Sequence, residues 1–193
     1  MQAKYSDFGF YVVDINYLKY LHDIDSEVFY DAAKAYDRKP FLGVIVTIDN
    51  CTYFIPLTSG KTKHSSWKLS DTDHYLIYEI INNKAVRKRD IIKPYKEEQV
   101  YRILAVLDIK KMIPVPEGCY MRIDFSKVED RPYRRLLIKE YEFCWGIRDG
   151  VLERAVKIYT EQKQNGKVHP FYCDYSRLEK ACAEYDDNVA VLV

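Results

Sequence analysis

The chain has 193 residues, of which 48% are apolar, and this combination is long and hydrophobic enough to exclude a disordered protein. Its 30 basic and 29 acidic residues leave a formal charge of +1, so bulk charge does not indicate nucleic-acid binding. The sequence has neither the roughly 20 consecutive apolar residues of a membrane span nor a signal region, and its five cysteines lack zinc-ligand spacing. We therefore expect a cytosolic (bacterial) protein with reduced, mostly buried thiols.

Charge is unevenly distributed along the chain. Residues 58–93 carry eight basic and four acidic residues, a net of +4, whereas residues 1–31 carry two basic and six acidic residues, a net of −4. Such polarity allows one basic face to meet a polyanion, although the two regions could equally pair with each other.

The first half of the sequence predicts one strand region before a helix and a second one after it. Residues 8–13 predict a strand, and the apolar spacing of Tyr17, Leu18 and Leu21 predicts a helix that Asp14 caps. Residues 25–40 indicate a loop or broken helix. Residues 41–48 and 51–57 then predict the two strands of a hairpin with a turn at residues 49–50.

The second half predicts further short strands and then helices. Strands are expected at residues 74–81, with a turn at Asn82-Asn83, and at 103–109, 112–115 and 119–124. Three apolar stripes after Pro132 have helical spacing; the second ends at Gly166, and Ser176 with Glu179 suggests a capping box for the third. Together these elements predict one α+β domain over residues 1–193, with a small antiparallel sheet or barrel surrounded by helices.

The most informative segment is residues 56–64, which follows the predicted hairpin. It places the hydroxyls of Thr58 and Ser59, the ammonium groups of Lys61 and Lys63, and the imidazole of His64 at one strand exit. Taken alone, such a segment is more often an ordinary polar loop. A hairpin also brings the residues before its first strand close to those after its second, so Tyr36 and Lys39 should lie near Thr58, Ser59 and Lys61.

The residue types in this cluster narrow the chemistry. No paired carboxylates or metal-ligand spacing accompany it, which disfavours a two-metal nuclease, and we expect neither metal nor cofactor. The P-loop pattern also fails, because position 55 is isoleucine where the first glycine is required. RNA cleavage by the substrate's own 2′-hydroxyl fits better, with hydroxyls and lysines to stabilise the phosphoryl oxygens and move protons. Its products would be a 2′,3′-cyclic phosphate and a 5′-hydroxyl.

Six short segments follow one another along nearly the whole chain. They are Tyr17-Leu18-Lys19-Tyr20-Leu21, Lys39-Pro40-Phe41-Leu42-Gly43-Val44, Tyr53-Phe54-Ile55-Pro56-Leu57-Thr58-Ser59-Gly60-Lys61, Lys111-Met112-Ile113-Pro114-Val115, Pro132-Tyr133-Arg134-Arg135-Leu136-Leu137 and Cys173-Asp174-Tyr175. In their order and spacing they resemble the ToxN/AbiQ family of type III toxin–antitoxin and abortive-infection toxins. One departure is Gly60, which stands where members of the family often have proline.

The resemblance implies a barrel-like core similar to MazF/Kid toxins, with added helices. It implies an endoribonuclease that cuts adenine-rich single-stranded RNA without metal and acts in phage defence. Its implied partners are cellular or phage RNA and a repeat-derived pseudoknot RNA antitoxin, which the toxin processes and which inhibits it in a closed toxin–RNA assembly. The implied catalytic residues are Thr58, Ser59 and Lys61, supported by Tyr36 and Lys39.

RNA binding by a groove requires basic side chains and aromatic platforms. The resemblance places Tyr17 and His64 along this groove, and Tyr17, Tyr36 and Trp67 could stack on bases. The basic candidates are Lys61, Lys63, Lys68, Arg87, Lys88 and Arg89. Arg87, Lys88 and Arg89 could equally well belong to a loop that only keeps the protein soluble. Two other functions stay open: a non-catalytic RNA-binding module, and, less favoured, a protein-binding SH3-like module.

Overall fold

The computed structural model describes residues 8–30, 40–48 and 51–190. Within them, one sheet contains nine strands. In chain order these are β1 (Gly9–Val13), β2 (Phe41–Ile48), β3 (Cys51–Ser59), β4 (Ser70–Asp71), β5 (His74–Asn82), β6 (Ile91–Lys96), β7 (Gln99–Asp108), β8 (Ile113–Pro114) and β9 (Tyr120–Arg122).

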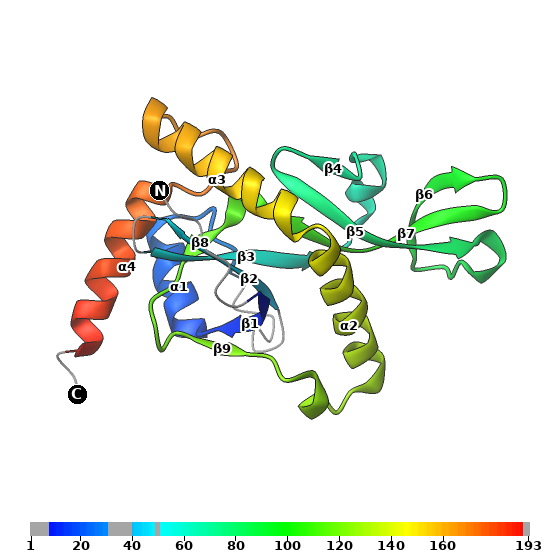
Figure 1. Cartoon of the computed structure of the whole chain (residues 1–193), viewed down its shortest axis with the longest axis horizontal. Coiled ribbons are helices and arrows are strands. Elements are labelled where there is room, and N and C mark those ends of the chain that lie inside the picture. Colours follow the sequence, from blue (N-terminus) through cyan, green and yellow to red (C-terminus); the bar gives the residue numbers. More distant parts are fainter. Residues whose placement is uncertain (1–7, 31–39, 49–50, 191–193) are drawn as a thin grey trace.

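Four α-helices accompany the sheet in the same part of the chain: α1 (Ile15–Ile24), α2 (Arg131–Gly146), α3 (Arg148–Asn165) and α4 (Tyr175–Ala190). Short 3-10 turns connect some strands: η2 (Thr62–Ser66), η3 (Asn83–Ala85), η4 (Ile109–Lys111) and η5 (Phe125–Lys127). In Figure 1, α2 and α3 follow one another across the middle of the molecule, α1 and α4 lie at one end, and β5, β6 and β7 extend to the other. The expected α+β class is therefore confirmed.

The sheet is antiparallel and open. Its strand order is β4-β5-β7-β3-β2-β1-β9, with β6 added to β7 and β8 added to β3. Among the described residues the two end strands, β4 and β9, do not pair with each other, so the expected barrel-like closure is wrong. Strand pairing explains the opening, because β3 exchanges β2 for β7 at Leu57 and the long β5–β7 ribbon continues away from β1 and β2.

Aspartate side chains cap the start of three helices, and a glycine ends the fourth. Asp14 accepts hydrogen bonds from the amides of α1, as expected from the sequence, and Asp130 caps α2 in the same way. At α4 the cap is Asp174, which accepts from the amide of Arg177 at 3.1 Å. Ser176 therefore lies inside the helix, and the expected Ser176–Glu179 capping box is wrong. Gly166 ends α3 in the left-handed conformation, with φ 61°.

The main core joins the sheet to all four helices and is rich in tyrosine. Tyr17, Tyr53, Tyr159 and Tyr175 are among the largest fully buried side chains. Glu179 of α4 accepts from the hydroxyls of Tyr53 (2.6 Å) and Tyr159 (2.7 Å), which links α4 to β3 and α3. The high tyrosine content thus contributes mainly to the core, where each ring supplies apolar area and the hydroxyl takes a polar partner.

The arm formed by β5, β6 and β7 differs most from the sequence expectation. The sequence analysis did not predict β6, which contains Pro94 and pairs only with β7. Its proline fits an edge strand, which has one side without ladder hydrogen bonds. Asn82 and Asn83 end β5 but form no tight hairpin turn; Asn82 instead caps the short turn η3.

Candidate active site

The candidate site begins where β3 changes partner. Phe41 of β2 is opposite Pro56, whereas Leu57, Thr58 and Ser59 pair with Leu107, Val106 and Ala105 of β7. Side chains alternate along a strand, so Thr58 and Ser59 leave opposite faces of the sheet. Ser59 shares the face of Leu57 and Leu107, which belong to the main core, and Thr58 shares the face of Val106, which belongs to a smaller apolar cluster.

Gly60 lies where β3 ends beside β6 and β7, and the chain leaves the sheet at this residue. Beyond Ser59, the edge of β7 is taken over by β6, whose Ile91 pairs with Ile103. The amide of Gly60 still donates to the carbonyl of Leu104 at 3.2 Å. A Cβ on this residue would lie 3.3 Å from the Ile103 carbonyl oxygen and 3.5 Å from Ile91. Glycine is therefore closely packed here, and its hydrogen bond holds the segment where a proline would lack the donor.

His64 fixes the backbone of Lys61. The Lys61 amide donates to Nδ1 of His64 at 2.9 Å, and the His64 amide donates to the Lys61 carbonyl at 2.8 Å. His64 is 3% exposed, and burial, followed by the nearby Lys63 and Lys61 ammonium groups, lowers its pKa to about 4. Because Nδ1 is an acceptor, the neutral ring carries its proton on Nε2. His64 thus holds the backbone of the exposed Lys61, and its contact with RNA stays a prediction.

Two cavities meet at Thr58. The larger, about 700 Å³, lies between the sheet and α2 and is bordered by Thr58, Ser59, Ala105, Tyr133 and Glu140 among others. The smaller, about 170 Å³, is bordered by Thr58 together with Lys61, Lys63, His64, Trp67 and Asp108. Thr58 is the hydroxyl residue common to both cavities, while Ser59 borders only the larger and Lys61 only the smaller.

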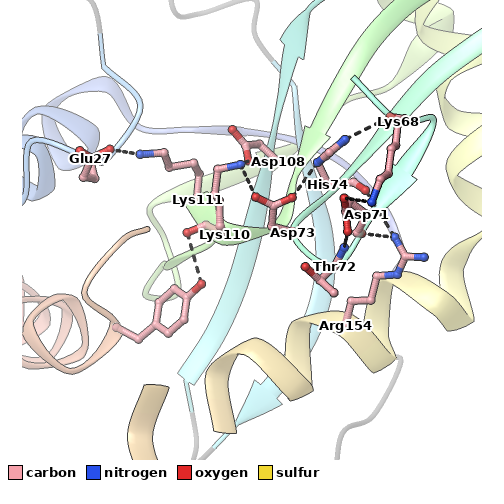
Figure 2. A network of polar contacts seen from close by, with 11 residues as sticks. Glu27, Lys68, Asp71, Thr72, Asp73, His74, Asp108, Lys110, Lys111 and Arg154 are labelled. Atoms are coloured by element: carbon pink, nitrogen blue, oxygen red, sulfur yellow. Dashed lines mark hydrogen bonds and ion pairs between the residues drawn. The ribbon is translucent and has the colours of Figure 1, made fainter. Parts of the chain in front are cut away.

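A polar network lies beside the smaller cavity, which one of its members, Asp108, borders (Figure 2). Asp73 accepts from Nδ1 of His74 at 2.6 Å and from Nζ of Lys110 at 2.7 Å, and these bonds hold the pKa of its carboxyl far below the usual value. Lys111 turns away from this group to Glu27, and Arg154 of α3 reaches the backbone carbonyl of Asp71. The network therefore fixes the start of β5, the end of β7 and α3 relative to one another.

Asp108 occupies an unusual position beside this network. Its Oδ1 lies 3.2 Å from Nζ of Lys110, yet it accepts no well-oriented hydrogen bond within the described part of the chain. Burial raises the pKa of its carboxyl in spite of the Lys110 ammonium. Figure 2 places Lys110 between Asp73 and Asp108, so one buried ammonium serves two carboxylates.

Trp67 connects the candidate loop to the network. Its ring lies 4.6 Å from the ring of His64 and 4.7 Å from that of His74, and the ammonium groups of Lys63 and Lys110 lie within 5.4 Å of its centroid. The side chain is half-buried. These contacts give Trp67 a clear structural role, and stacking on an RNA base stays a prediction for its exposed part.

The structure also corrects or limits several other site predictions. Tyr17 is fully buried and its hydroxyl donates to the carbonyl of Pro114 at 2.8 Å, so the expected stacking on RNA is wrong. Its ring closes the core between α1 and α4, where it contacts Tyr185. Tyr36 and Lys39 lie outside the described residues. The adjacent Pro40 accepts a hydrogen bond from the amide of Leu57 at 3.1 Å, next to Thr58.

The basic candidates are exposed and lie on two segments. Lys63 lies on η2 and borders the smaller cavity, and Lys68 follows η2 and pairs with Asp71. Arg87, Lys88 and Arg89 form the loop that enters β6, and the amide of Arg87 donates to Asp90. Since β6 starts against Gly60, this loop leads directly to the candidate site. Their contact with RNA stays a prediction.

Among the described residues, no three His, Cys, Asp or Glu side chains gather as a set of metal ligands. Nor does any helix in that part of the chain combine the length and apolarity of a membrane span. The buried cysteines Cys144 and Cys173 have thiol pKa values raised by burial, which fits the expected inert, reduced thiols.

A family model described as "Toxin ToxN, type III toxin-antitoxin system" matches residues 9–183 of the chain. The chain belongs to the ToxN family. Among relatives, it is 27% identical to the endoribonuclease ToxN of Bacillus thuringiensis subsp. kurstaki, over 93% of this chain and 84% of that protein. It is 25% identical to the endoribonuclease ToxN of Pectobacterium atrosepticum, over 91% and 92% of the two chains.

Solved structures of the family agree with the fold. One, from work on toxin inhibition by a non-coding RNA pseudoknot in type III toxin–antitoxin systems, has a TM-score of 0.69 and 26% identity, covering 92% of this chain and 96% of the other. Another, the lactococcal anti-phage endoribonuclease AbiQ, has a TM-score of 0.68 at 19% identity, covering 94% and 99%, and supports the fold alone. The expected family membership is therefore confirmed.

Sequence reasoning missed four polar residues in or beside the site: Asp108 and Glu140 border its cavities, and His74 and Lys110 belong to the adjacent polar network. Lys110 and Glu140 are 8% and 5% exposed, values that charged residues rarely have. A signal for Glu140 was present in the sequence, because it lies with Leu137 and Cys144 on the buried stripe of α2. A charged residue on the apolar stripe of a predicted helix indicates one of two things. Either the predicted helix is in the wrong register, or the residue has a functional role.

Proposed function

We propose that this ToxN-family protein is an endoribonuclease toxin that cleaves single-stranded, adenine-rich RNA without metal, leaving 2′,3′-cyclic phosphate and 5′-hydroxyl ends. The observation that carries the proposal is the arrangement at the end of β3: Thr58 borders both cavities, Ser59 one of them and Lys61 the other. A phosphate held at Thr58 would meet hydroxyl donors and an ammonium from two sides.

The chemistry requires few groups. The 2′-hydroxyl of the RNA attacks the adjacent phosphorus, and the 5′-oxygen departs. Thr58 and Ser59 would donate hydrogen bonds to the non-bridging oxygens, and Lys61, held by His64, would neutralise the charge that develops there. Positioning and electrostatic stabilisation of this kind account for much of the acceleration of phosphoryl transfer by enzymes. We further propose that Tyr36 and Lys39 support this site.

The family relationship supports the proposed partners. We propose that the protein processes, and is inhibited by, a pseudoknotted RNA antitoxin in a closed toxin–RNA assembly, and that it defends a bacterial cell against phage. The related structures include one from work on a processed non-coding RNA that regulates a bacterial antiviral system, with a TM-score of 0.67 and 25% identity. The exposed Lys63, Lys68 and Arg87–Arg89 loop are the proposed contacts to the RNA backbone.

The test is cleavage of a single-stranded, adenine-rich RNA by the purified protein, with and without EDTA. Wild type should cleave equally in both, and Thr58→Ala, Ser59→Ala and Lys61→Ala should each lose about 100-fold or more in kcat. Lys157→Ala, an exposed change on α3, is a matched control. Cleavage that EDTA abolishes would contradict the metal-free mechanism. Salt-sensitive binding of RNA that stays intact would instead favour the non-catalytic RNA-binding alternative.

A further inference from the structure

Glu140 is a buried carboxyl group that faces the candidate site without a partner. It is 5% exposed, and within the described residues no hydrogen bond or ion pair to its carboxylate is present. An unpaired buried carboxylate is costly, so such a group calls for a physical explanation. Its two neighbours on the same face of α2, Leu137 and Cys144, are ordinary core residues.

The carboxyl group borders the same 700 Å³ cavity as Thr58 and Ser59. The residue beside it, Lys139, links α2 to β5, since its Nζ lies 2.6 Å from Oε2 of Glu79. Glu140 therefore borders the cavity from α2, while Thr58 and Ser59 border it from the end of β3. Lys61 borders the smaller cavity, which Thr58 also borders.

We propose that Glu140 is the general base of the RNA cleavage reaction, acting from the α2 side of Thr58, with Lys61 as the general acid on the other side. This inference rests on the proposed function. The Glu140 carboxylate takes the proton of the 2′-hydroxyl as the new O–P bond forms, directly or through one water molecule. The bond from phosphorus to the 5′-oxygen breaks, and that oxygen takes a proton from the Lys61 ammonium. Exchange of protons with solvent restores both groups.

The two-sided arrangement suits an in-line displacement, in which the attacking and leaving oxygens are on opposite sides of phosphorus. The titration of Glu140 agrees with the role, because burial raises the pKa of its carboxyl to about 7. A base with this pKa is half-ionised at neutral pH and stronger than an ordinary glutamate. The other titratable groups facing it are Glu129, Asp130 and Tyr133 around the cavity and Cys144 one turn along α2; the described β1, β3 and β7 residues that line the cavity contribute none.

The first test compares Glu140→Gln with Glu142→Gln, an exposed change on the same helix. Glutamine keeps the shape of the side chain and cannot titrate. We expect Glu140→Gln to lower kcat by about 100-fold or more with unchanged affinity for RNA, and Glu142→Gln to behave as wild type. For wild type, kcat/KM should rise about tenfold per pH unit up to about pH 7, and Glu140→Gln should lose this dependence. A Glu140→Gln enzyme with wild-type rates, or an unchanged pH profile, would overturn the proposal.

The second test distinguishes the role of Glu140 as general base from that of Lys61 as general acid. An RNA with sulfur in place of the 5′-oxygen at the cleavage site has a leaving group that needs no proton. This substrate should restore cleavage by Lys61→Ala and leave Glu140→Gln impaired. If this substrate restored cleavage by Glu140→Gln instead, the assignment of base and acid would be reversed. The failure of the proposed function is distinct, because in that case the wild-type protein would not cleave either substrate.

Discussion

At the scale of single residues, the position of Lys61 depends on a hydrogen bond between its own amide and the His64 ring. Lysine side chains have several rotatable bonds, so a fixed backbone is the main means by which the protein can aim this ammonium. His64 provides that restraint from a buried position, since its ring is packed against Trp67.

This restraint can be tested with two substitutions at one site. His64→Ala removes the acceptor and the ring, and we expect it to cost about 2–3 kcal/mol of unfolding free energy and at least tenfold in kcat. In His64→Asn the side-chain oxygen can replace Nδ1 as acceptor for the Lys61 amide. Urea unfolding and RNA cleavage should therefore rank wild type above Asn and Asn above Ala. Equal activity of the Asn and Ala variants would show that the hydrogen bond does not position Lys61.

Gly60 offers a second test at the residue scale. A methyl group there would press against the Ile103 carbonyl, so Gly60→Ala should lower stability by about 1 kcal/mol and shift Lys61 enough to reduce cleavage. Gly146→Ala is the matched control, since a Cβ at that position meets nothing within 4 Å. Thermal unfolding and cleavage rates measured side by side give the answer, and a Gly60→Ala protein as stable and active as Gly146→Ala would contradict the close packing.

At the scale of elements, the site depends on strands and helices held together by a few buried polar groups. α2 is tied to β5 through Lys139 and Glu79, which also pairs with Arg102 of β7. α4 is tied to β3 and α3 through Glu179. Burial favours the neutral form of Glu179, but hydrogen bonds from Lys163, Tyr53 and Tyr159 outweigh it and hold the carboxyl pKa below its usual value.

Removal of Glu179 should therefore loosen α4 without affecting the chemistry. Glu179→Ala leaves the hydroxyls of Tyr53 and Tyr159 without their acceptor, at a cost of about 2–4 kcal/mol. Lys180→Ala, an exposed neighbour, should change stability by less than about 0.5 kcal/mol. Denaturant unfolding measures both, and hydrogen exchange should show the loss concentrated in α4. An equal effect of the two substitutions would contradict this account.

At the scale of the whole molecule, two buried groups give opposite contributions to stability as pH changes. His64 has a folded pKa of about 4 against about 6.5 when unfolded, so the unfolded chain binds more protons between these values and stability rises with pH. Glu140 has a folded pKa of about 7 against about 4.5 unfolded, so the folded protein binds more protons and stability falls as pH rises. Each contributes up to about 1.4 kcal/mol per pH unit.

The two contributions nearly cancel between about pH 4.5 and 6.5, which gives a prediction for single substitutions. Relative to wild type, His64→Asn should become less stable as pH rises through this range, since only Glu140 remains. Glu140→Gln should become more stable over the same range. The difference in unfolding free energy from wild type, measured by urea titration at several pH values, removes the contributions of all other groups. Parallel curves for all three proteins would contradict both pKa shifts.

Most local elements could be predicted because their signals are local. The strand–helix start with its Asp14 cap, the hairpin strands of β2 and β3, and three late helices follow from apolar spacing and capping residues. β6 was missed since Pro94 and scattered charges hide an edge strand that depends on β7. Tyr17 was misjudged because a tyrosine on a helix suits both a core and a binding surface, and only burial distinguishes them.

The sequence by itself determined the family and the mixed α/β class, and it predicted a site from Thr58 to Lys61, because these inferences depend on residue types and short spacings. The tertiary structure decided how the sheet stays open, why the chain leaves it at Gly60, and which groups meet at Thr58. Those facts depend on pairing between strands distant in sequence, with β6 and β3 sharing one edge of β7. It also decided that His64 holds the backbone of Lys61 and that Glu140 borders the same cavity as Thr58 and Ser59, since burial and partners are set by the folded chain as a whole.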